Sequence, residues 1–227
     1  MLLLATDTSG KYGSNALARV PGTTGGPSDV EIIEVVPLAG GTFSAQLVPQ
    51  IAALLARHGF RKEDIGGFAC ASGPGSFTGL RVGLAAIKAL AEVLDKPIAA
   101  VSLLEVVAIA GTARGKVTAV LDAGRGEVYA GEYEVRAESA TCLSERLLSL
   151  DELTERRAGQ IITPDANVTD GLRSKQIPVE VIERPRSDAI ARLGRRKILA
   201  GETVSPEELE ANYIRRSDAE IFSKTRG

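Results

Sequence analysis

The chain has 227 residues, of which 44% are hydrophobic, 25% are charged and 4% are aromatic, and it contains no Trp. These values are ordinary for a globular protein with an aliphatic, Ala-rich core, and the length suffices for one large domain or two small ones. The formal net charge of −2 gives no general attraction to nucleic acids or membranes, so any RNA contact must come from local patches or from another subunit.

The opening apolar run ends at Ala5, which is too short for a secretory signal, and no stretch approaches the roughly 18 apolar residues of a membrane span. Cys70 and Cys142 lie in strand-like surroundings, which favours two buried thiols in a reducing compartment over a disulfide. We therefore expect a cytoplasmic protein that makes no membrane contact.

The first half of the chain predicts three strands followed by alternating helices and strands. Apolar periodicity predicts a helix over 45–58, in which Pro49 removes one backbone hydrogen bond, and a Gly-rich loop at 72–79 leads into a helix over 78–94. This order is typical of a ribonuclease-H-like domain, in which helices flank a mixed sheet. The other predicted elements are strands at 2–6, 14–20, 29–36, 65–71 and 98–101, and a helix at 103–110.

The segment 112–116 resembles a domain boundary, because the pattern that opens the chain repeats after it. The strand at 2–6 ends in Asp7, a tight turn and a second strand, and the strand at 117–121 ends in Asp122 in the same way. The second part continues with predicted helices at 151–157 and 188–200 and strands at 127–135, 160–163 and 179–182. We therefore predict two related lobes, 1–111 and a smaller one at 112–227, with the tail from about 206 packing back on the first lobe.

The loop Ser72–Gly79 follows a strand and opens a helix, where free backbone N–H groups and the helix dipole favour anions. It lacks the Gly-Lys-Ser/Thr ending of a P-loop, and it lacks the acidic residue that completes a dinucleotide fingerprint. Two interpretations stay open. Gly73, Gly75 and Ser76 contact a phosphate, or the glycines allow close packing in a tight turn.

Asp7 and Asp122, one in each predicted lobe, are the best-placed acidic residues. In two-lobed nucleotide-binding folds such turns face the phosphates, so Asp7, Thr8, Ser9 and Asp122 are candidate contacts to a nucleotide or a metal-bound phosphate. The alternative is that each Asp stabilises its own turn. An actin-fold ATPase or a small-molecule kinase would use Asp7 and Asp122.

His58 is the only His of the chain, and the sequence holds no Cys or His cluster for a metal. The residue lies at a predicted helix end, where a positive charge is favourable, and nothing places it near a nucleophilic Ser. We expect neither a metal site nor hydrolase chemistry.

The predicted helix at 78–94 has an apolar arc of roughly 220°, wider than the stripe of about 100° that a one-sided surface helix needs. Either the helix at 45–58 covers the surplus, or both helices present a shared apolar face to another subunit, which is the interpretation that we favour. The predicted partner interface consists of Leu47, Ile51, Leu54, Leu80, Leu84, Ile87 and Ala91.

The stretch 71–91, ASGPGSFTGLRVGLAAIKALA, resembles the TsaB (YeaZ) family, a subunit of the bacterial complex that makes threonylcarbamoyladenosine in tRNA. The opening Leu-Ala-Thr-Asp-Thr-Ser, the block 122–129 and the tail Tyr213-Ile214-Arg215 also match, in family order. The resemblance implies an actin-like ATPase fold (ASKHA) with two ribonuclease-H-like lobes. It also implies a non-catalytic subunit that supports a TsaD-type paralogue, the enzyme that transfers threonylcarbamoyl to the adenosine next to the anticodon.

The resemblance further implies dimer formation through the helices 45–58 and 78–94, and an assembly that a TsaE-type ATPase subunit and tRNA join. We expect a homodimer when the chain is alone, no tightly bound cofactor, and a role for ATP and magnesium only in the assembled complex. Family members often carry a His where this chain has Phe43, so a polar contact from that position is in question. The sequence assigns no role to Asn212–Arg216.

Overall fold

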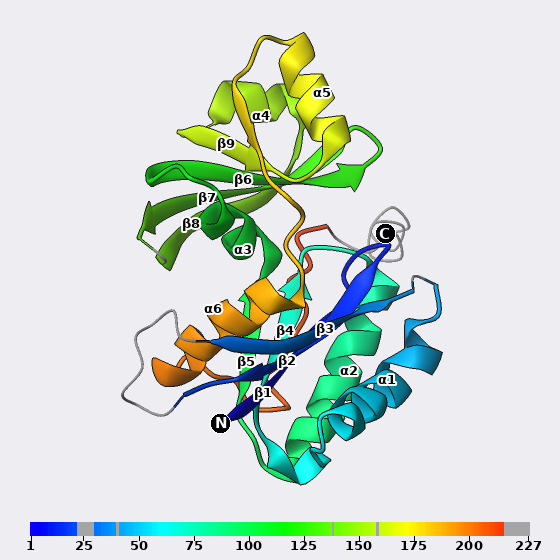
Figure 1. Ribbon diagram of the computed structural model, residues 1–227. Coiled ribbons are helices and arrows are strands. Elements are labelled where there is room, and N and C mark those ends of the chain that lie inside the picture. The colour runs from blue at the N-terminus through cyan, green and yellow to red at the C-terminus, as the bar shows by residue number, and fades with distance from the viewer. Residues whose placement is uncertain (22–29, 40, 138, 158, 216–227) are drawn as a thin grey trace, which may run out of the picture. The chain divides into compact units, whose positions relative to one another are not determined.

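The computed structural model describes residues 1–21, 30–39, 41–137, 139–157 and 159–215, and the predicted strand start at Asp29 and the tail residue Arg216 lie outside these ranges. The chain forms two compact units (Figure 1). The first combines Met1–Ser102 with Pro185–Ala211, and the second combines Leu103–Arg184 with the chain from Asn212 onward.

The first unit is built on a five-stranded mixed sheet with the order β3-β2-β1-β4-β5. The pairs β1–β2 and β2–β3 are antiparallel, whereas β1–β4 and β4–β5 are parallel. The apolar run of β1 is central and fully buried, as expected for a strand that is covered on both faces. The strands are β1 (Leu2–Asp7), β2 (Gly13–Arg19), β3 (Glu31–Leu38), β4 (Ile65–Gly73) and β5 (Ile98–Ser102).

Three helices cover the two faces of this sheet. α1 (Phe43–Arg57) and α2 (Phe77–Leu94) share a buried cluster with Leu4 and Leu17, and a short 3-10 helix, η1 (Lys62–Asp64), follows α1. α6 (Ser187–Leu199) packs on the opposite face, where a Cβ atom built on Gly194 would lie 2.3 Å from the Cβ of Ala69. Gly194 therefore lets α6 approach the sheet closely.

The second unit repeats this architecture with a sheet of the order β10-β9-β6-β7-β8. The pairs β6–β7 and β7–β8 are antiparallel, and β6–β9 and β9–β10 are parallel, which is the same topology as in the first sheet. The repeat seen around Asp7 and Asp122 thus extends to the whole sheet. The strands are β6 (Gly115–Gly124), β7 (Glu127–Arg136), β8 (Ser139–Ser149), β9 (Gln160–Thr163) and β10 (Val179–Val181).

The helices of the second unit also lie on both faces of its sheet. α4 (Leu150–Arg156) and α5 (Ala166–Ser174) pack on one face through a cluster that includes Val120, Val128 and Leu153. α3 (Leu103–Ala110) packs on the other face, where Leu104 lies next to Gly131. Two mixed-sheet lobes flanked by helices, the predicted fold class, are confirmed.

The lobe limits differ from the predicted division at 111/112. The predicted division puts α3 in the first lobe, but this helix packs on β6 and β7. It puts α6 in the second lobe, but this helix packs on β1, β2, β4 and β5. The order of elements cannot reveal which sheet a helix buries its apolar side against. In the tail, Val204 bridges to Ile98 and Leu209 is buried in the first core, whereas Asn212 contacts Glu145 of the second unit.

Candidate functional site

The Gly-rich loop packs directly against the turn that follows β1. The backbone N–H of Ser76 donates to the carbonyl of Ser9 over 2.6 Å, and the Thr8 hydroxyl donates to the carbonyl of Gly79 over 2.7 Å. The Ser76 hydroxyl caps α2 by accepting from the Gly79 N–H at 3.2 Å. Four of the predicted phosphate contacts (Thr8, Ser9, Gly75 and Ser76) therefore lie together, and the three hydroxyl groups among them bond to Asp7 or Gly79 of the same chain.

The glycines of this loop are needed because the turn is so close. A Cβ atom on Gly79 would lie 2.1 Å from the Thr8 carbonyl oxygen, and one on Gly75 would lie 2.4 Å from the Ser9 carbonyl oxygen. Gly73 ends β4 with a φ of 125°, a conformation that favours Gly. On this side of the loop the space is filled by the chain itself, which supports the close-packing interpretation.

Asp7 and Asp122 each stabilise the turn that follows their strand. Oδ1 of Asp7 accepts from the backbone N–H and the hydroxyl of Ser9 over 2.9 and 2.6 Å. Oδ1 of Asp122 accepts from the backbone N–H of Gly124 over 2.7 Å, and its Oδ2 accepts from the Asn167 amide over 3.1 Å. Both carboxylates thus make the same bond to the residue two positions on, in separate units.

The seven residues predicted as the partner interface are buried inside the first unit, so this assignment is wrong at the level of side chains. Their relative exposures lie between 0 and 5%, because these large apolar side chains join α1 and α2 to each other and to the sheet. A side chain with no exposed surface cannot contact a partner unless the core opens. The residues withdrawn from the predicted interface are Leu47, Ile51, Leu54, Leu80, Leu84, Ile87 and Ala91.

A different set of apolar residues is exposed on the same two helices, and we name it the α1/α2 outward face. It consists mostly of Ala, with Val48 52% and Val93 73% exposed, and the Phe77 ring lies under the guanidinium of Arg81 at 3.7 Å from its centroid. Small residues recur every three or four positions along α1 and over the second half of α2, a pattern in the sequence that the predicted interface of Leu and Ile did not use. The members are Ala45, Val48, Pro49, Ala52, Ala53 and Ala56 of α1 and Phe77, Ala85, Ala89 and Val93 of α2.

The remaining candidates for chemistry are engaged or inert. His58 Nε2 lies 2.8 Å from Glu34 Oε2 in a surface pair that Arg57 also joins. Burial raises the pKa of the Cys70 thiol to about 12, which keeps it protonated, and Cys142 is exposed on β8, contrary to the prediction of two buried thiols. Both thiols are free.

The described residues contain neither a metal-binding cluster nor a membrane-spanning helix. Within them, no group of three or more His, Cys, Asp or Glu side chains is placed to hold a metal ion. None of their helices combines the length and the apolar character of a membrane span.

The tail motif is fixed to the second sheet. The Asn212 amide donates to Glu145, which also accepts from the Tyr133 hydroxyl, and the Arg215 guanidinium pairs with Glu127. Phe43 is buried at the start of α1, beside Gly13. The sequence could not assign a role to Asn212–Arg216, because Glu145 and Glu127, the partners of Asn212 and Arg215, are 67 and 88 positions away and leave no local pattern.

Comparison with known proteins identifies the family. The model of the family "TsaD: tRNA N6-adenosine threonylcarbamoyltransferase" matches residues 35–185. Proteins named tRNA threonylcarbamoyladenosine biosynthesis protein TsaB match from Bacillus subtilis, with 36% identity over 137 residues, and from Haemophilus influenzae, with 28% over 231 residues. The chain belongs to the TsaD family, in its TsaB (YeaZ) group.

The coverage of these TsaB relatives is uneven. The B. subtilis match covers 60% of this chain and 56% of that protein, and the H. influenzae match covers 95% and 94%. YeaZ from Pseudomonas aeruginosa has the same fold, with a TM-score of 0.73 and 24% identity over 94% of this chain and 100% of that one. A second structure, described as similar to peptidase YeaZ from that organism, has a TM-score of 0.71 and 28% identity over 94% and 99%. The TsaB (YeaZ) group, the actin-like fold and the link to tRNA threonylcarbamoyladenosine biosynthesis are thus those that the resemblance implied.

Proposed function

We propose that the chain is a non-catalytic subunit that binds a TsaD-type paralogue and supports threonylcarbamoyl transfer to the adenosine next to the anticodon of tRNA. The TsaB relatives are named as biosynthesis proteins of this modified nucleoside. The observation that carries the proposal is the α1/α2 outward face, a stripe of small apolar side chains on two adjacent helices.

This face suits helix-to-helix docking. Ala side chains let the backbone of a partner helix approach closely, and no charged residue lies among those of α1, whereas Arg81, Lys88 and Glu92 lie among the α2 members. Phe77 and Arg81 stand at one end of α2, and aromatic and Arg side chains are frequent energetic anchors of interfaces. The engagement of Asp7 and Asp122 in their own turns supports a role in binding over a role in catalysis.

Val48→Asp tests this interface, because it places a charge at the centre of the α1 stripe without touching the buried side of the helix. Val and Asp have similar helix propensities, so the fold should be kept. We expect the affinity for the TsaD-type paralogue, measured by isothermal titration calorimetry, to fall at least tenfold, which is about 1.4 kcal/mol.

Val181→Asp is the matched control, because Val181 is 50% exposed on β10 of the second unit, against 52% for Val48. It should leave the affinity within twofold of the unmodified chain. Equal affinities for the two variants, with intact circular dichroism spectra, would contradict the interface.

We propose the same face for the homodimer, so that the chain alone pairs with itself and the paralogue displaces one copy. Sedimentation of the Val48→Asp variant should then give a monomer. The remaining partners in the proposal are a TsaE-type ATPase subunit and tRNA, which join the heterodimer in the cytoplasm.

We further propose that ATP and magnesium act only in the assembled complex. Titration of Mg-ATP into the purified chain should give no micromolar binding and no turnover, since Asp7 and Asp122 already accept hydrogen bonds within their turns. Micromolar binding with turnover, lost on Asp7→Asn, would instead support an actin-fold ATPase or small-molecule kinase.

A further inference from the structure

The repeat of the fold exposes a difference between the two units. α1 and α4 each follow the third strand of their sheet, but α1 has 15 residues and α4 has 7. In the first unit α1 covers a face lined by Leu4 and Leu17. On the corresponding face of the second sheet, beside the shorter α4, Glu132 of β7 is partly exposed and Arg146 of β8 is exposed.

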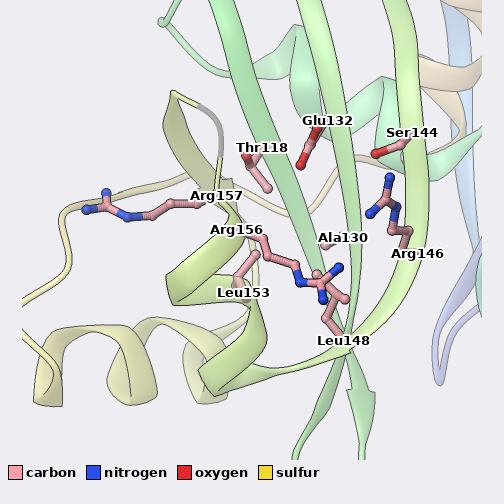
Figure 2. A pocket seen from close by; sticks show the side chains of 9 residues that line it. All are labelled: Thr118, Ala130, Glu132, Ser144, Arg146, Leu148, Leu153, Arg156 and Arg157. Atoms are coloured by element: carbon pink, nitrogen blue, oxygen red, sulfur yellow. The ribbon is translucent and has the colours of Figure 1, made fainter.

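A shallow hollow lies on this part of the second sheet, beside the C-terminal end of α4 (Figure 2). Its space of about 240 Å³ includes open solvent, so the hollow does not enclose a small molecule. The hollow therefore suits one group of a larger ligand. It is lined by Thr118, Ala130, Glu132, Ser144, Arg146, Leu148, Leu153, Arg156 and Arg157.

Arginines dominate the charge of the hollow. Arg146 lies on β8, directly opposite Ala130 of β7. Arg156 is the last residue of α4, and its side chain extends back over the sheet, whereas the side chain of Arg157 points away from the sheet (Figure 2). Three Arg against the single Glu132 give the lining a net charge of +2 in a chain whose total is −2.

The described residues give these guanidinium groups little compensation. No hydrogen bond or ion pair among those residues engages Arg146 or Arg157. The charge of Arg156 contributes to the lowered pKa of Glu152, but as the smallest cause, after the hydrogen bonds from Ser149. Guanidinium forks bind phosphate oxygens in pairs, so the hollow offers two such groups to an anion.

We propose that this hollow binds the phosphodiester backbone of an RNA. A protein partner is less suited, because no aromatic side chain lines the hollow and, of its apolar residues, Ala130 and Leu153 are buried and only Leu148 is partly exposed. Only the choice of tRNA as that RNA rests on the proposed function. Glu132 weakens the attraction and keeps the contact readily reversible.

The test compares two double variants of the full chain by fluorescence anisotropy with a labelled, unmodified tRNA transcript. Arg146→Gln/Arg156→Gln should weaken binding at least fivefold and lower the slope of log affinity against log salt by about 1–2, since each phosphate contact contributes roughly 0.7–0.9. Glu132→Gln should strengthen binding two- to threefold. Arg136→Gln/Arg173→Gln, which removes two exposed Arg of the same unit, is the control and should change affinity less than twofold.

Three outcomes would overturn the proposal. The first is that the unmodified chain does not bind tRNA. The second is that the site variant and the control variant lose the same affinity for tRNA. The third is that both Glu132→Gln and, separately, Arg146→Gln/Arg156→Gln bind tRNA with the affinity of the unmodified chain. The site variant should still bind the TsaD-type paralogue with unchanged affinity. If it loses the paralogue and keeps tRNA, the hollow is a protein contact and the proposal fails, whereas the Val48→Asp test of the proposed function stands or falls independently.

Discussion

At the scale of single residues, the sequence pointed to the Gly-rich loop but could not choose between two roles for its residues. Gly73, Gly75 and Ser76 fit a phosphate contact and a packed turn equally well, because both need glycines that let the backbone come close and free N–H groups. The decisive neighbours, Thr8 and Ser9, lie about 70 positions earlier. Such a contact leaves no signal in the local pattern.

Gly79→Ala should therefore destabilise the chain, although Ala normally stabilises a helix relative to Gly. The new Cβ would lie 2.1 Å from a backbone oxygen of Thr8, which cannot rotate away. We expect a loss of about 2 kcal/mol and a melting temperature about 4–8 °C lower, measured by differential scanning calorimetry.

Gly171→Ala provides the comparison for this prediction. There the added Cβ would meet Cδ2 of Leu150 at 2.5 Å, the far end of a flexible side chain that can move. The change in stability should stay below about 1 kcal/mol. If both variants melt alike, the close contact between Gly79 and Thr8 is not what holds the loop.

At the scale of elements, hydrophobic periodicity predicted the first 110 residues well and the rest in part. β8 and α5 were missed, because Ser139–Ser149 lacks alternation and Ala166–Ser174 contains Gly171 among weak helix formers. The helical wheel of α2 measured the width of its apolar arc correctly, but width alone does not say which flank is covered. Side-chain size indicates it in part, since Leu80, Leu84 and Ile87 fill the core and Ala85 and Ala89 are exposed, although Ala91 is buried.

The proposed interface therefore lies on the exposed side of α1 and α2, and not on the buried side that the sequence predicted. The experiment on Val48 therefore probes a surface, and a substitution such as Leu84→Asp would mainly probe the core. An Asp at Leu84 would be buried without a partner and should unfold the first unit. Loss of binding by such a variant would carry no information on the interface.

At the scale of the whole molecule, the two halves share one topology but exchange their third helices. α3 follows the strands of the first sheet and packs on the second, while α6 follows those of the second sheet and packs on the first. The sequence around Asp7 and Asp122 indicates the repeat, but the sequences of α3 and α6 do not indicate which sheet each helix packs on. Neither unit is a continuous stretch of sequence.

A fragment of residues 1–111 should consequently fail to fold, although it contains the complete first sheet. Without α6, the face around Leu3 and Ala69 has no cover. We expect circular dichroism without a cooperative melt. A fragment that joins 1–102 to 185–211 through a flexible Gly/Ser linker should regain the melt, and a cooperative melt of 1–111 itself would contradict the role of α6.

The late position of α6 in the chain has a consequence during translation. A ribosome adding about 5–20 residues per second finishes β5 at Ser102 roughly 5–20 s before it reaches the end of α6 at Leu199. In that interval one apolar face of the first sheet is synthesised but uncovered, and it is a natural binding site for a nascent-chain chaperone. The first sheet is thus made before the second, but the helix that covers one of its faces is made after every strand of the second sheet.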